Sequence, residues 1–180
     1  NHQQIGKMTL PANHEVVLET IMGNAMELEL ELDPKDSPMM EINVLRSPGK
    51  EEFTRIAFFK KRGLKYRPFH PNIRALSEDS PELKVAPVRH ESIITLDTSY
   101  ASTLPGVLSR APETASLHLE DDEPLQLRIF IDRSVVEVFV NGKQCLAVRV
   151  YPGREDSMGF SLRAQGQEAE LISLDAWHMN

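Results

Sequence analysis

Apolar and polar residues alternate most regularly between residues 125 and 150. From Leu125 to Ile131 every second residue is apolar, so these side chains fall on one face of an extended strand and the polar ones on the other. Between residues 136 and 140 the alternation resumes one residue out of step. We predict that a corner or a β-bulge between Asp132 and Ser134 causes this shift.

The pair Asn141-Gly142 predicts a tight turn after this strand. Asn and Gly are the residues that best tolerate the positive φ angles of a two-residue type I′ hairpin turn. Apolar residues alternate again from Leu146 to Val150. Residues 125–150 are therefore predicted to form three antiparallel strands in a meander.

The same period of two recurs along most of the chain. It predicts further strands at residues 16–21, 26–32, 41–45, 53–59, 92–97, 115–119, 159–163 and 169–177. Gly23-Asn24 indicates a hairpin between the first two, and Glu27, Glu29 and Glu31 share one face of the second, which we expect to be wet. Roughly a dozen short strands predict an all-β fold, an antiparallel two-sheet β-sandwich of the jelly-roll or concanavalin-like type.

Length and composition favour a single domain. The chain has 180 residues, of which 41% are hydrophobic, and 12 Pro and 9 Gly provide breaks between strands. One core of this size can form without splitting. We expect residues 16–180 to form the sandwich and residues 1–15, which show no alternation, to be a connector. Residues 67–87 contain four prolines and are expected to be mostly loop or edge.

The charge of the chain limits its partners. A formal net charge of −7 repels polyanions, and no basic run is interleaved with aromatic residues, so we expect no nucleic-acid partner. The basic cluster Lys60-Lys61-Arg62 is better explained as a solvated strand end. No apolar run is long enough to cross a bilayer, and we expect no membrane contact.

Metal and cofactor chemistry find little support in the sequence. The run from Glu120 to Glu123 is interpreted as a solvated turn, because consecutive carboxylates rarely converge and the spacing matches no calcium loop. The histidines have no ligand spacing; they are His2, His14, His70, His90, His118 and His178. Cys145 is alone, which excludes an intramolecular disulfide, and we expect a structural thiol at least half buried in its strand. We predict no metal and no cofactor.

Several motifs resemble one known family. They are IFIDRSVVEVFVNG at residues 129–142, the return segment VRVYP, ITLDTS at residues 94–99 and MELELEL at residues 26–32. Together with the closing segment 169–177, they resemble the C-terminal β-sandwich module of glycoside hydrolase family 32, the β-fructosidase family of invertases, levanases and inulinases. The resemblance implies a catalytic β-propeller in the same protein and an enzyme that hydrolyses sucrose or fructans with retention of the configuration at the anomeric carbon. The chain is then expected to be a piece of that enzyme, with residues 1–15 as the connector from the propeller.

The acids that this family uses for catalysis are not expected in the chain. They lie in a WMNDPNG-type segment, an RDP segment and an EC segment of complete members. The nearest fragments are Leu32-Asp33-Pro34 and Gln144-Cys145, with a leucine in place of the arginine and an amide in place of the acid. An amide cannot donate a proton, and retention needs two carboxyl groups roughly 5 Å apart. We predict no catalytic residues and an inactive chain within a glycosidase of the β-fructofuranosidase type.

The polar residues of the family-like motifs are assigned a structural role: Asp97, Asp132, Arg133, Ser134, Glu137, Asn141 and Gly142. At the end of a strand, Asp132 can accept hydrogen bonds from the following backbone, as in an Asx turn, and Arg133 can hold it. Alternatively, Arg133 or Glu137 contacts the propeller or a sugar. Polar groups at corners usually satisfy the backbone first, which favours structural or interdomain roles.

Two functions remain open, and a third, an intact enzyme of another kind, is less favoured. The first is a structural module that packs on the catalytic propeller and stabilises it, which predicts an apolar patch rimmed by charges. The alternative is an autonomous module that binds fructan or sucrose-type carbohydrate, which would need exposed aromatic rings. Tyr100, in an expected loop, is the best candidate, ahead of Tyr66 and Tyr151, whereas Trp177 is expected to be buried. The sequence does not indicate a compartment.

Overall fold

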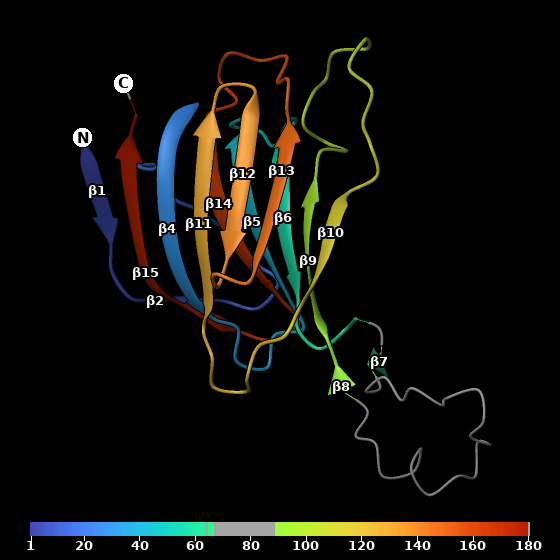
Figure 1. The fold of residues 1–180 in the computed structure, drawn as a ribbon. Helices are drawn as coiled ribbons and strands as arrows, with labels where there is room; N and C mark the ends of the chain where they lie inside the picture. Colours follow the sequence, from blue (N-terminus) through green and yellow to red (C-terminus); the bar gives the residue numbers. More distant parts are fainter. Residues whose placement is uncertain (64, 67–88, 180) are drawn as a thin grey trace, which may run out of the picture.

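Two antiparallel sheets form the molecule (Figure 1). The computed structural model describes residues 1–63, 65–66 and 89–179. The seven-stranded sheet runs in the order β1 (His2–Ile5), β15 (Ala169–His178), β4 (Ala25–Asp33), β11 (Leu125–Asp132), β12 (Val135–Val140) and β13 (Gln144–Arg149), and β2 (Met8–Leu10) also pairs with β15. The six-stranded sheet runs in the order β10 (Glu113–Leu117), β9 (Ser92–Asp97), β6 (Thr54–Phe59), β5 (Met39–Arg46), β14 (Gly159–Gln165) and β3 (Glu15–Val17). A separate ribbon pairs β7 (Lys65–Tyr66) with β8 (Arg89–His90).

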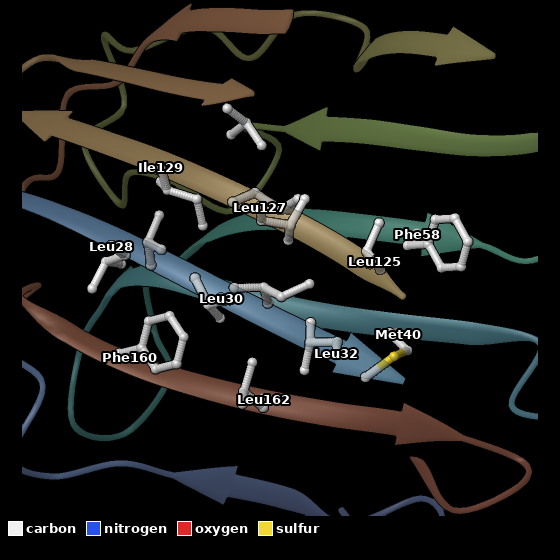
Figure 2. Close-up of a cluster of buried hydrophobic side chains, with 14 of the residues drawn as sticks. Leu28, Leu30, Leu32, Met40, Phe58, Leu125, Leu127, Ile129, Phe160 and Leu162 are labelled. Carbon is white, nitrogen blue, oxygen red and sulfur yellow. The ribbon is translucent and has the colours of Figure 1, made fainter. Parts of the chain in front are cut away.

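The core lies between the two sheets, where the alternating apolar residues of each sheet face those of the other. The labelled side chains in Figure 2 are all at most 3% exposed; they are Leu28, Leu30, Leu32, Leu125, Leu127 and Ile129 from the seven-stranded sheet and Met40, Phe58, Phe160 and Leu162 from the six-stranded sheet. Burial of such side chains is the main force that holds two sheets together. This arrangement confirms the predicted two-sheet β-sandwich.

The predicted hairpin of residues 16–21 and 26–32 is wrong. Strand β3 pairs with β14 in the six-stranded sheet, whereas β4 lies between β15 and β11 in the seven-stranded sheet. The connection crosses from one sheet to the other, and Ile21 within it is fully buried. Alternation predicts that a strand exists but carries no information on its partner. A connection between two sheets that has a turn-like sequence is therefore mistaken for a hairpin turn.

The shift in phase after Asp132 comes from a tight hairpin turn, not from the predicted corner or bulge. Asp132 pairs with Val135, so Arg133 and Ser134 alone make the turn, and Arg133 has a φ of 54°. Facing residues of antiparallel strands share one face of the sheet. Asp132 and Val135 therefore both point outward. The last inward-facing side chain of β11 is at residue 131, and the first of β12 is at residue 136.

The turn at Asn141-Gly142 has the predicted backbone conformation. Asn141 has a φ of 49° and Gly142 a φ of 62°, and the Lys143 N–H donates to the Val140 carbonyl at 2.8 Å. Pairing resumes between Val140 and Gln144, so the loop has one residue more than the two that were predicted. The Asn141 side chain also accepts from the Gln126 N–H at 3.0 Å, which fixes the turn to strand β11.

Residues 1–15 contain strands that the sequence analysis did not predict. Strands β1 and β2 both pair with β15, and Leu10 is fully buried. The polar stretch His2–Gln4 hides the alternation, because an edge strand with one wet face needs few apolar residues. That these residues connect the sandwich to a propeller stays a prediction. The proline-rich segment 67–87, with His70, lies outside the described residues, as does the side chain of Tyr66.

Candidate functional site

Five connections meet at the end of the sandwich where β9 and β13 end (Figure 1). They are residues 18–24, 47–53, 98–112, 133–134 and 150–158, and we call this region the loop end. Backbone hydrogen bonds join them in pairs: Gly23 donates to Met158 at 2.8 Å, Phe53 to Tyr100 at 2.9 Å, and Val150 to Ser134 at 2.9 Å. Segments far apart in the sequence thus form one surface.

The carboxylate of Glu52 lies at the centre of the loop end and is 0% exposed. Its Oε1 accepts hydrogen bonds from the backbone N–H and the hydroxyl of Thr103, at 2.6 and 2.8 Å, and from the Gly153 N–H at 2.9 Å. Its Oε2 accepts from the Arg154 N–H at 3.1 Å and the Ser157 hydroxyl at 2.7 Å. One side chain therefore clamps segments 98–112 and 150–158 to segment 47–53.

These hydrogen bonds set the charge of Glu52. Burial raises the pKa of its carboxyl, but the donors of Ser157, Thr103 and Gly153 outweigh burial and lower the pKa to about 2. Hydrogen bonds to the ionised form favour it in this way. A carboxyl group of such low pKa holds no proton near neutral pH, so it cannot serve there as a general acid. The geometry suits a structural clamp.

A second ionised carboxylate lies on the outer face of the six-stranded sheet. Glu15 accepts from the Ser161 hydroxyl at 2.6 Å and from the Arg46 guanidinium at 3.1 and 3.2 Å, and it pairs with Lys50 at 2.9 Å. Burial raises the pKa of Glu15, but Arg46, Ser161 and Lys50 lower it to about 2. Arg46 also donates to the carbonyl of Ser47 at 2.8 Å, which links this network to the loop end.

A row of cations and aromatic rings continues from Lys50 toward strand β9. Lys50 lies over the ring of Phe53 at 4.8 Å, and Phe53 stacks on Tyr100 at 5.0 Å. Arg55 lies 5.9 Å from the centre of the Tyr100 ring and pairs with Asp97 at 2.7 Å. Arg and Tyr in such clusters are enriched where protein surfaces meet. The row gives the loop end a charged and aromatic rim.

The loop end also exposes most of the large apolar side chains that face solvent. Among the described residues seven are exposed, and five of them lie in the loop end: Met22, Tyr100, Leu104, Leu108 and Tyr151. Leu108 is 86% exposed. Below segment 98–112 a hollow of about 840 Å³ extends to strand β13, with Arg110, Arg149 and Tyr151 in its wall. An apolar patch with a polar rim marks an interaction surface.

The structure does not bring the seven predicted motif residues together. Asp97 is buried at the loop end, where it accepts from the Ser99 N–H at 2.9 Å and pairs with Arg55; burial raises its pKa, and these contacts lower it below the usual value. The turn of Asn141 and Gly142 joins β12 to β13 at the opposite end of the sandwich (Figure 1). Glu137 lies mid-strand on the outer face of β12.

The turn of Asp132, Arg133 and Ser134 does lie in the loop end. Arg133 donates its backbone N–H to the Asn24 carbonyl at 2.6 Å, and Ser134 accepts from Val150 through its own carbonyl. The expected Asx turn at Asp132 is not among the hydrogen bonds of the described residues, because the two-residue hairpin leaves its side chain exposed. That these residues contact another domain stays a prediction.

Two expectations for single residues are wrong. Cys145 is exposed, because it occupies an outward position on the edge strand β13, opposite Phe139. Trp177 is half-buried on the outer face of the seven-stranded sheet and stacks on His2 at 4.9 Å. The bulge in β15 between Leu171 and Ser173 decides which alternate residues after it point outward. Alternation in the sequence does not reveal this bulge.

The expected turn at residues 120–123 is present, with Glu123 donating its N–H to the Glu120 carbonyl at 3.1 Å. Within the part of the chain that the structure describes, no group of three or more His, Cys, Asp or Glu could hold a metal ion. No helix in that part is long and apolar enough to span a membrane. Tyr100 is exposed, but Phe53 covers one face of its ring; its role in sugar binding stays a prediction.

Glu52 and Glu15 were missed in the sequence. Glu52 stands in the polar stretch Gly49–Glu52, which reads as a solvated turn, and its donors are 51 to 105 residues away. Glu15 closes a segment without alternation. Nothing in the local pattern distinguishes these carboxylates from their exposed neighbours.

Comparisons with known proteins give one consistent result. The family described as "Glycosyl hydrolases family 32 C terminal" matches residues 2–178. A raffinose invertase of Escherichia coli is 49% identical over 63 residues, 34% of this chain and 13% of that protein. An insoluble beta-fructofuranosidase isoenzyme of Arabidopsis thaliana is 30% identical over 142 residues, 76% of this chain and 21% of that protein. The chain thus spans about a fifth or less of these curated relatives.

A solved structure shares the fold over the whole chain. Fructan 1-exohydrolase IIa from Cichorium intybus superposes with a TM-score of 0.75 at 15% identity, covering 100% of this chain and 35% of that one.

Proposed function

The chain belongs to the family of C-terminal domains of glycosyl hydrolases family 32, and we propose that it serves there as the non-catalytic companion of a catalytic domain in the same protein. The relatives are named for the hydrolysis of raffinose, β-fructofuranosides and fructans. The parent enzyme is accordingly a β-fructosidase, and this sandwich stabilises its catalytic domain by packing against it.

The observation that carries this proposal is the composition of the loop end. Exposed apolar side chains gather there, bounded by the row of Lys50, Phe53, Tyr100 and Arg55. Clamping by Glu52 holds the segments in place before any partner arrives, so little conformational entropy is lost on docking. A rigid apolar surface with a polar rim is the usual form of an interface between domains.

The two carboxylates of low pKa, the buried Glu52 and the partly buried Glu15, support a structural role over a catalytic one. Glu52 is saturated by five hydrogen bonds and Glu15 by Arg46, Lys50 and Ser161. Both stay ionised well below neutral pH. Hydrolysis of a glycosidic bond needs one acid that is protonated at working pH, and neither group meets this requirement.

A charge placed in the loop end tests the proposed interface. Leu108→Asp in the full-length enzyme that carries this chain is expected to lower the midpoint of thermal inactivation by roughly 3 °C or more, because docking would bury an unpaired carboxylate. In the 180-residue chain alone the same substitution should leave the midpoint nearly unchanged, since Leu108 is exposed there.

The matched control is Val17→Asp, which also charges an exposed apolar residue but lies on β3, outside the loop end. It should leave thermal inactivation of the full-length enzyme close to that of the wild type. Equal inactivation midpoints for wild type and Leu108→Asp would overturn the proposal that the loop end packs on the catalytic domain.

A further inference from the structure

A second hollow lies on the outer face of the seven-stranded sheet, away from the loop end. Its volume is about 570 Å³, within the usual size of small-molecule sites. Side chains of four neighbouring strands line it: Ser173 and Asp175 from β15, Glu29 and Glu31 from β4, Gln126, Arg128 and Phe130 from β11, and Phe139 from β12. Asn141 and Gly142 close its lower end.

The strand register arranges the polar side chains of this hollow in a row. Ser173 faces Glu31 across the β15–β4 ladder, and Glu31 faces Gln126 across the β4–β11 ladder. Neighbouring strands lie about 4.8 Å apart, so the three side chains stand side by side at that spacing. Among the described residues they make no side-chain hydrogen bond or ion pair with one another or with other groups. Their hydrogen-bonding capacity is left for water or a ligand.

Three of the four acids around this row have a partner. Arg128 donates to Glu27 at 2.6 Å and lies 3.4 Å from Glu29, and His2 contacts Asp175 at 2.7 Å. Glu31 is the carboxylate in the row without such a partner in the described part of the chain. An anionic ligand is repelled by these acids, and a strongly cationic one finds most of them already paired.

An aromatic pair forms the remaining wall. Phe139 is 41% exposed and meets Phe130 edge to face at 6.0 Å, and Arg128 covers the Phe130 ring at 5.1 Å. The exposed ring offers an apolar surface beside a row of hydrogen-bonding groups. A ligand that fits carries hydroxyl groups along one edge and C–H groups on a flat face, and it bears no negative charge.

We propose that this hollow binds a neutral oligosaccharide, separately from the catalytic domain. The inference rests on the proposed function, because a β-fructosidase meets such chains as its substrates. Glu31, Gln126 and Ser173 hydrogen-bond the sugar hydroxyls, and Phe139 packs on the C–H face of a ring. Since the hollow lies away from the loop end, the saccharide and the catalytic domain occupy different surfaces.

Calorimetric titration of the 180-residue chain with short inulin-type fructo-oligosaccharides tests this proposal. The wild type is expected to show saturable binding, and the double variant Glu31→Ala/Gln126→Ala to bind about tenfold more weakly or worse, because it loses two groups that hydrogen-bond the ligand. Glu137→Ala on the same face, outside the hollow, and Tyr100→Ala at the loop end should bind as the wild type does. Thermal midpoints of all variants close to that of the wild type establish that each is folded.

Three results would overturn the proposal. The first is no saturable binding by the wild type, and the second is that Tyr100→Ala loses binding while the double variant binds as the wild type does. The third is that the wild type binds oligolysine and not the oligosaccharide. None of them tests whether the loop end packs on the catalytic domain. The docking of the catalytic domain is tested separately by Leu108→Asp, so the two proposals can fail independently.

Discussion

Replacing Glu52 by alanine will lower the free energy of unfolding of the chain by about 3 kcal/mol or more. The substitution removes one fully buried carboxylate and leaves five donors of Thr103, Gly153, Arg154 and Ser157 without their acceptor. Each buried donor left unpaired costs about 1–3 kcal/mol, although neighbouring losses do not add fully. Urea denaturation followed by circular dichroism measures the difference.

The loss should depend on pH in a defined direction. The folded chain holds the pKa of Glu52 at about 2, below the ordinary 4.5. A depressed pKa contributes stability above the unfolded value and loses it as pH falls through the folded value. The difference between wild type and Glu52→Ala should therefore be full above about pH 4.5 and shrink toward pH 2.

The matched control is Glu51→Ala, one residue earlier in the same turn. Glu51 is exposed, accepts one hydrogen bond from the Ser47 hydroxyl and pairs loosely with Arg154 at 3.8 Å. Its removal should cost a small fraction of the loss at Glu52. Similar losses for the two substitutions would mean that Glu52 does not clamp the loop end.

Replacing Phe160 by alanine will lower the free energy of unfolding by about 3–5 kcal/mol. Phe160 of β14 is 2% exposed and points into the core between the sheets (Figure 2). Its removal leaves a cavity that the two sheets cannot close without shifting against each other. Denaturation in urea measures the effect, and the slope of the transition should stay unchanged because the same surface is exposed on unfolding.

Phe139→Ala provides the comparison for the same chemical change. Phe139 lies on the outer face of the seven-stranded sheet and contacts Phe130, so its loss should cost about 1 kcal/mol or less. A Phe139 variant as unstable as the Phe160 variant would contradict the assignment of the core to the space between the sheets.

The sequence predicts strands well where one face is buried and the other is wet. Strand β11 and the Asn141-Gly142 turn follow directly from alternation and from the φ preferences of Asn and Gly. It does not predict which strands pair. The partners of β3 and β4 depend on a connection that crosses the core at Ile21, and an edge strand such as β1 needs too few apolar residues to show a pattern.

The candidate site was least accessible from sequence. Glu52 reads as a surface residue until the fold brings Thr103 and Ser157 to its carboxylate. The row of Ser173, Glu31 and Gln126 depends on the register of two ladders, one of which contains a bulge. Such sites are made by long-range pairing, and local periodicity carries no information about it.

Hydrogen–deuterium exchange tests the central claim, that the loop end packs on a catalytic domain, most directly. Amides of residues 104–111 would be measured in the 180-residue chain alone and in the full-length enzyme. We predict that exchange in this segment slows at least about tenfold in the full-length enzyme, while the turn at Asn141-Gly142 exchanges equally in both. Equal exchange of residues 104–111 in the two proteins would contradict the account.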